Sequence, residues 1–99
     1  VYTNACGPYA RRVLAARGLS DAFDAVYGVE HAGFRPKPEP EAFAAVFARD
    51  GLSPRNAAMF EDDPRNLAAP HAMGMRTVLV GPAAPAGDHT TTGLLSQVV

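Results

Sequence analysis

Three consecutive carboxylates, Glu61, Asp62 and Asp63, follow a short apolar run in the second half of the chain. Like charges this close repel one another unless a cation, a hydrogen-bond donor or solvent offsets them. Mg²⁺ is the natural cation for such a cluster, because hard divalent ions prefer oxygen ligands. The same residues also fit the start of a helix, with Asp63 as N-cap and Pro64 as the first helical residue. The two interpretations are compatible, and both stay open on these residues alone.

A second polar group, Thr3 and Asn4, follows the apolar run at the start of the chain. A threonine hydroxyl with neighbouring backbone N–H groups can hold a phosphate oxygen. The alternative is an ordinary strand end at which Asn4 begins a turn. On these two residues alone the second interpretation is favoured.

Lys37 lies between two prolines, Pro36 and Pro38. Proline fixes its own φ and biases the preceding residue toward extended conformations, so the loop is stiff. A rigidly placed ammonium suits a phosphoryl group or a neighbouring carboxylate. The alternative is a solvated loop lysine, and the two interpretations are evenly balanced.

Glycine followed by an apolar residue closes three helical patterns, at Gly18, Gly51 and Gly74. This pairing is typical of a left-handed helix cap. It predicts helices over residues 8–17, 39–50 and 64–73, with Ala10, Val13 and Leu14 on one face of the first. In the second helix Phe43, Val46 and Phe47 share a face. The third contains a proline at position 70, which predicts a kink or an early loosening.

Short apolar runs without polar alternation lie between these helices, over residues 1–3, 25–29, 57–60 and 76–80. Such runs predict strands that are buried on both faces, as in a parallel sheet. The alternation of strands and helices favours a three-layer α/β fold with a parallel, Rossmann-like sheet. A loop over residues 81–88 and a last short helix, capped within residues 90–92 and continuing through residue 98, complete the prediction.

The composition is that of an ordinary globular protein: 47% of the 99 residues are hydrophobic, 19% are charged, and the net charge is −1. This length predicts one domain at most. Without a basic stripe we expect no nucleic-acid polymer as partner, and without a long apolar run we expect no membrane span. One cysteine excludes an internal disulfide and fits the cytoplasm. The sequence leaves the oligomeric state open.

Taken together, these groups resemble the C-terminal part of a haloacid dehalogenase (HAD) superfamily hydrolase, and in particular the pyrimidine 5′-nucleotidase-like branch. The likeness spans residues 1 to about 80 and rests on several segments in one order. These are a strand ending in Thr3-Asn4, Gly33-Phe34-Arg35-Pro36-Lys37-Pro38, Phe60 through Leu67, and His71-Ala72-Met73-Gly74-Met75.

The resemblance implies phosphoryl transfer through an aspartyl-phosphate, with a nucleotide or another small phosphate ester as substrate. Thr3 and Asn4 would bind the phosphoryl group, and Lys37 would offset charge between it and the nucleophile. Asp62, with Asp63 as a second candidate, would hold Mg²⁺. The acidic pair favours a phosphatase over a haloalkanoic acid dehalogenase. Thr3, Lys37 and Asp62, the expected catalytic residues, should converge at the carboxyl edge of the sheet.

The chain departs from the family pattern in one respect, because it contains no Asp-x-Asp motif for the nucleophile. No cap region is recognisable, and the chain begins at Val1 within an apolar run. We therefore expect residues 1–99 to be the C-terminal part of a HAD-like core domain. The missing first strand would lie at the centre of the sheet, between the strands ending at Thr3 and Phe60. The alternative is a non-catalytic α/β fragment or degenerate relative that serves as an interaction module through its exposed strand edges.

Overall fold

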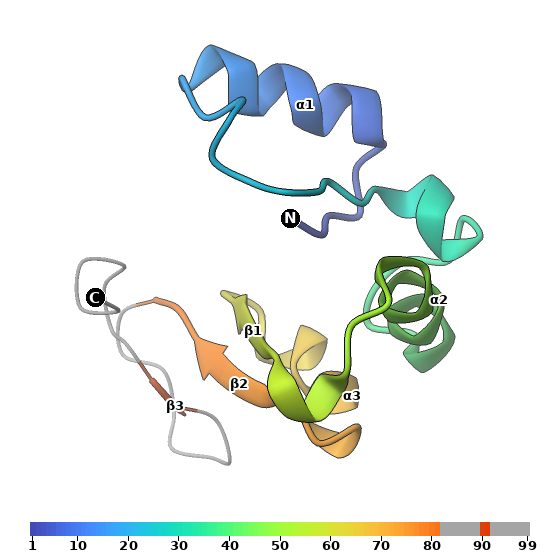
Figure 1. The fold of residues 1–99 in the computed structure, drawn as a ribbon. Coiled ribbons are helices and arrows are strands. Elements are labelled where there is room, and N and C mark those ends of the chain that lie inside the picture. The colour runs from blue at the N-terminus through green and yellow to red at the C-terminus, as the bar shows by residue number, and fades with distance from the viewer. Residues whose placement is uncertain (82–89, 92–99) are drawn as a thin grey trace. The chain divides into compact units, whose positions relative to one another are not determined.

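The computed structural model describes residues 1–81 and 90–91 and divides the chain into two units, Val1–Asp50 and Gly51–Val99 (Figure 1). The elements of the first unit are α1 (Gly7–Ala16), the short 3₁₀ helix η1 (Val29–Ala32) and α2 (Pro40–Asp50). The second unit contains η2 (Pro54–Asn56), β1 (Ala58–Glu61), η3 (Pro64–Asn66), α3 (Ala68–Ala72), β2 (Arg76–Leu79) and β3 (Thr90–Thr91). The order of strands and helices confirms an α/β fold with an incomplete Rossmann-like core.

Both helices predicted for the first unit form within one residue of the expected bounds. The cap of α1 is the expected one: Gly18 has a φ of 71°, and Leu19 N–H donates to the Leu14 carbonyl at 2.8 Å. The apolar face of α2 is confirmed as core, since Phe43, Val46 and Phe47 are all buried. In α1 the expected face is only partly covered, because Ala10 is buried whereas Val13 is 41% exposed.

The strands predicted over residues 1–3 and 25–29 are reduced to one parallel bridge between Tyr2 and Tyr27. Thr3 N–H donates to the Tyr27 carbonyl at 2.9 Å, and Tyr27 N–H donates to the Val1 carbonyl at 2.8 Å. Beyond this bridge the regular ladder is lost: Val29 N–H donates to the Ala5 carbonyl at 2.9 Å, and Gly28 N–H donates to His31 Nδ1 at 2.9 Å. The expected strand end at position 29 is therefore wrong, and η1 begins there.

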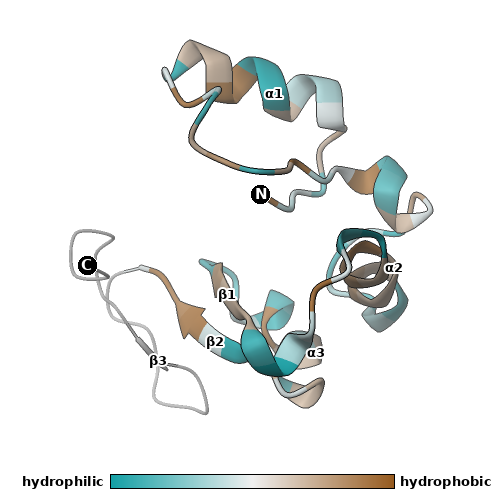
Figure 2. Ribbon diagram, in the orientation of Figure 1, coloured by the Kyte–Doolittle hydropathy of each residue, from teal (hydrophilic) through white to brown (hydrophobic). Residues whose placement is uncertain are grey.

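The second unit contains a sheet in the order β1-β2-β3, in which neighbouring strands are parallel. Phe60 pairs with Val78, and α3 lies in the connection between β1 and β2. Both predicted strands are confirmed within one residue. Figure 2 shows the hydrophobic part of β2 in brown, and its last three residues are buried. In β1 burial on both faces is not found, because its residues alternate in exposure and Phe60 is 52% exposed.

The helix predicted over residues 64–73 is divided into η3 and α3. Asp63 is the N-cap of η3 and Pro64 its first residue, as expected. Because α3 begins only at Ala68, Pro70 lies in its first turn, where a backbone N–H has no partner within the helix. The predicted loosening is thus displaced to the junction before α3 and does not fall at Pro70.

The expected loop over residues 81–88 and the terminal helix through residue 98 lie almost wholly outside the described residues. Thr90 and Thr91, expected to cap that helix, instead form β3 beside β2. Among the residues that the structure describes, no helix has the length and apolar character needed to cross a membrane.

Candidate functional site

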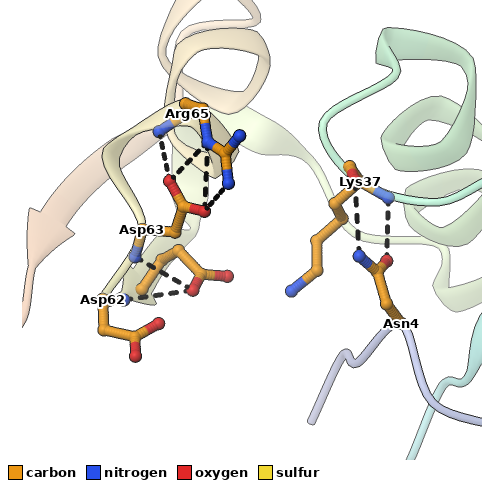
Figure 3. A network of polar contacts seen from close by, with 6 residues as sticks. Asn4, Lys37, Asp62, Asp63 and Arg65 are labelled. Carbon is orange, nitrogen blue, oxygen red and sulfur yellow. Dashed lines mark hydrogen bonds and ion pairs between the residues drawn. The ribbon is translucent and has the colours of Figure 1, made fainter.

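Asn4 lies before α1 and Lys37 lies in the loop between η1 and α2, and the two residues are joined by two hydrogen bonds. Lys37 N–H donates to Asn4 Oδ1 at 2.8 Å, and Asn4 Nδ2 donates to the Lys37 carbonyl at 3.3 Å (Figure 3). The Lys37–Pro38 peptide bond is cis. The structure thus brings together two of the residues that the sequence singles out, and it does so through the backbone of Lys37.

The Lys37 side chain lies against the segment that carries Thr3 and Asn4. Its Nζ donates to the Tyr2 carbonyl at 3.3 Å and lies 4.9 Å from the centroid of the Tyr2 ring. A cation over an aromatic face at this distance is attracted by the ring quadrupole. Tyr2 in turn packs edge-on against Phe43 of α2, with ring centroids 5.7 Å apart. Lys37 is therefore held in place and is not a freely solvated loop lysine.

Thr3 lies at the end of the strand-like segment and is partly buried. Its backbone N–H donates to the Tyr27 carbonyl, and its Oγ1 accepts a hydrogen bond from Ala5 N–H at 3.1 Å. A hydroxyl can still donate while it accepts, so Thr3 retains a donor for an anion. The local fold thus places a hydroxyl donor next to the residue that holds Lys37.

Glu30 fixes the start of α1 directly after this segment. Its two carboxylate oxygens accept from Gly7 N–H at 2.9 and 3.0 Å. The hydrogen bonds from Gly7, and more weakly the nearby His31, hold the pKa of Glu30 below its usual value, against a smaller opposing effect of burial. A carboxylate at this helix end also complements the helix dipole. The sequence analysis missed this residue, because nothing local in the sequence indicates that η1 packs against α1.

The acidic cluster of the second unit begins at the carboxyl end of β1, as predicted. Glu61 Oε1 accepts from the backbone N–H groups of Asp62 at 3.1 Å and Asp63 at 3.3 Å (Figure 3). The pKa of Asp62 is raised by a side-chain hydrogen bond that its protonated carboxyl donates to Glu61, and by the charge of Glu61. The carboxylate of Asp62 is exposed. Glu61 therefore shapes the cluster, a role that the sequence analysis did not assign to it.

Asp63 has a different environment from Asp62. It accepts from Arg65 N–H at 3.0 Å as N-cap of η3, and its carboxylate forms an ion pair with the Arg65 guanidinium at 2.7 Å (Figure 3). The helix-start interpretation of Asp63 is thus confirmed. Because Asp63 is already bound to a cation, Asp62 is the better placed of the two for a metal ion.

The chemistry of this donor set fits a hard divalent cation, because exposed carboxylate oxygens that repel one another gain most from one. Within residues 1–81 and 90–91, no group of three or more His, Cys, Asp or Glu side chains is arranged to hold a metal ion. The candidate residues Thr3, Asn4 and Lys37 lie in the first unit, and Asp62 and Asp63 lie in the second. Because the positions of the units relative to one another are not determined, the convergence of Thr3, Lys37 and Asp62 stays a prediction.

Comparison with known proteins gives the family. A family model described as haloacid dehalogenase-like hydrolase matches residues 1–80. Among solved structures, the chain is similar to a HAD phosphatase from Thermococcus onnurineus, with a TM-score of 0.67 and 30% sequence identity. That match covers 87% of this chain and 40% of the phosphatase chain. Comparison with curated proteins gives no match. The chain belongs to the haloacid dehalogenase-like hydrolase family.

Proposed function

We propose that residues 1–99 are the C-terminal part of the catalytic core of a phosphoric monoester hydrolase. The observation that carries this proposal is the pairing of Asn4 with Lys37, because it joins the Thr3 segment to the lysine loop. A neutral donor and a cation from adjoining segments are what a phosphoryl group requires, since phosphoryl transfer relies on positioning and on charge neutralisation. The similarity to a HAD phosphatase supports the same reaction class.

In the proposed reaction an aspartate carboxylate attacks phosphorus, the bond to the leaving oxygen breaks, and the alcohol departs after it gains a proton. Water then attacks phosphorus, the bond between the aspartate oxygen and phosphorus breaks, and inorganic phosphate leaves while the carboxylate is restored. The nucleophile would come from outside this sequence, which contains no Asp-x-Asp motif. The Thr3 hydroxyl would donate to a phosphoryl oxygen, and the Lys37 ammonium would offset charge on the nucleophile and the phosphoryl group.

Asp62 would hold Mg²⁺ in this scheme, with Asp63 in second place because of its ion pair with Arg65. When bound, Mg²⁺ supplies positive charge that offsets the negative charge on the phosphoryl oxygens. The raised pKa of Asp62 supports this role, because a neighbouring divalent cation would relieve the repulsion by Glu61.

The substrate class that we propose is a nucleotide or another small phosphate ester. This choice rests on the sequence likeness to the pyrimidine 5′-nucleotidase-like branch over residues 1 to about 80. Selection among such substrates would be made by residues outside this chain, because the likeness includes no cap region.

The proposal can be tested by titrating the 99-residue protein with inorganic phosphate in a calorimeter, with and without Mg²⁺. Lys37→Met should weaken phosphate binding by about tenfold or more, because it removes a charge-assisted interaction. Thr3→Ala should weaken it by only a few fold, since one neutral hydrogen bond is worth about 1 kcal/mol. Asp62→Asn should remove the dependence on Mg²⁺ without weakening the metal-free binding, because it removes a negative charge.

The matched control is Arg17→Met, which removes an exposed cation at the far end of α1 from Gly7. It should leave phosphate binding unchanged. The assignment of Lys37 would be wrong if Lys37→Met bound phosphate as tightly as this control. The 99-residue protein should also hydrolyse p-nitrophenyl phosphate poorly or not at all, because covalent catalysis requires the nucleophile. Robust Mg²⁺-dependent turnover by this chain would contradict the proposed origin of the nucleophile.

A further inference from the structure

The Asn4 side chain binds both backbone polar groups of Lys37, a residue 33 positions later in the sequence. Its carbonyl oxygen accepts from the Lys37 N–H, and its amide nitrogen donates to the Lys37 carbonyl. The amide therefore pairs with Lys37 as a neighbouring strand would. Figure 3 shows the Asn4 amide turned toward this backbone. An asparagine used in this way acts on the position of Lys37.

The ammonium of Lys37 is anchored to the same segment at a second point. Nζ donates to the carbonyl of Tyr2 and lies over the Tyr2 ring, and Tyr2 is two residues before Asn4. The backbone and the charged end of Lys37 are thus both fixed against residues 2–4. A lysine has many side-chain rotamers to lose on binding, so anchoring it in advance favours any anion that it must meet.

We propose that Asn4 is a positioning residue that sets the Lys37 ammonium for the phosphoryl group. The last part of this inference rests on the proposed function, whereas the pairing of Asn4 with Lys37 does not. The assignment differs from the phosphate-binding role that the family resemblance implies for Asn4. Its reason is geometric: Oδ1 accepts from the Lys37 N–H and one amide N–H donates to the Lys37 carbonyl, so both ends of the side-chain amide are oriented by the backbone of Lys37.

Lys37 is the only lysine of the chain, so isotope-labelled lysine gives a single backbone amide signal in the NMR spectrum. Hydrogen exchange of this amide measures the bond to Asn4 directly, without phosphate or metal. Asn4→Ala should speed the exchange by about tenfold, the effect of one lost hydrogen bond. Asn4→Asp keeps the acceptor and should exchange at a rate close to that of the parent. The matched control is Asn56→Ala, which removes an exposed asparagine in the other unit.

A second readout separates positioning from a merely structural role. The side-chain signals of Lys37 should show a ring-current shift from Tyr2, which Tyr2→Leu removes. In Asn4→Ala these signals should move toward those of Tyr2→Leu even though the protein stays folded. Addition of inorganic phosphate should move the Lys37 side-chain signals of the parent, and Asn4→Ala should require several times more phosphate for the same response.

The inference is overturned if the Lys37 amide exchanges equally fast in the parent and in Asn4→Ala. If Asn4→Ala does not fold, Asn4→Asp decides, because rapid amide exchange in that folded variant would exclude the acceptor role of Oδ1. Equal phosphate responses in the parent and Asn4→Ala, with faster exchange in the latter, would also overturn the positioning role. A parent protein that shows no response to phosphate would count against the proposed function. Amide exchange and the ring-current shift would still decide whether Asn4 pairs with Lys37.

Discussion

Replacing Gly28 by alanine should destabilise the first unit strongly, because this buried glycine lies in close contact with the backbone of residues 5–7. An added Cβ would collide with Glu30 Oε1 and with the backbone nitrogen of Gly7, and it would lie 2.7 Å from the Ala5 carbonyl oxygen. Gly28 has a φ of −106°, which any residue can adopt, so the effect is purely steric. Because two of the three atoms belong to the backbone, no side-chain rotation relieves the collision.

The size of the effect follows from overpacking of the site by the added methyl group. Overpacking by a methyl group typically costs about 1–3 kcal/mol, and we expect the upper end because the Glu30 cap of α1 is displaced as well. For a domain of this length about 3 kcal/mol lowers Tm by roughly 12–24 °C. Gly18→Ala is the matched control. Its φ of 71° imposes strain of about 1 kcal/mol, but no atom lies within 4 Å of an added Cβ.

Urea unfolding followed by circular dichroism measures both variants against the parent. Gly28→Ala should lower the free energy of unfolding by about 2 kcal/mol more than Gly18→Ala does. The reasoning is refuted if the two variants are equally stable, because the close approach at Gly28 would then be absent in solution. An unchanged m-value is needed for this comparison, since it shows that the same surface unfolds.

Four further predictions concern the same unfolding assay. Tyr2→Phe should raise the free energy of unfolding by about 1 kcal/mol, because Tyr2 Oη is buried with no hydrogen-bond partner among the described residues. Tyr27→Phe should lower the free energy of unfolding, because the Tyr27 hydroxyl donates to Asp50 at 2.8 Å. The lowered pKa of Glu30 gives stability that is present above its ordinary value of 4.5 and is lost as the pH falls through the folded value, so Glu30→Gln should flatten the acid limb of the pH profile. The raised pKa of Asp62 has the opposite effect on stability, because its charged form is disfavoured in the folded protein. Asp62→Asn should therefore raise the free energy of unfolding above pH 3.8, and this gain should disappear in stronger acid.

The helices could be predicted from the sequence because their signals are local. The Gly18 and Gly74 caps each fold back within one turn, and the Met75 N–H donates to the Pro70 carbonyl at 3.0 Å as such a cap requires. The apolar spacing of α2 also specifies its buried face without knowledge of its partners. Interactions within a few residues are thus enough for these elements.

The strands were predicted less well because pairing depends on residues far away in the sequence. The apolar run at positions 25–29 has strand-like composition, but among the described residues its bridge partner is Tyr2 at Tyr27 alone, and Val29 already begins η1. Likewise, β1 is apolar throughout its first three residues, yet Phe60 is half exposed in this chain. Burial on both faces depends on which segments cover the strand, and the composition of the strand carries no information about them.

The roles of individual residues in the site also depend on residues that the local sequence does not reveal. Proline on both sides of Lys37 indicates a rigidly presented ammonium, but nothing in the local sequence indicates that Asn4 binds the Lys37 backbone. The consecutive carboxylates indicated a charged cluster, and only the ion pair with Arg65 separates Asp63 from Asp62. Sequence spacing therefore identified the groups that can do chemistry, whereas side-chain geometry assigned the residues that orient them. This division is physical, because a charge is a property of one residue and its orientation is a property of its neighbours.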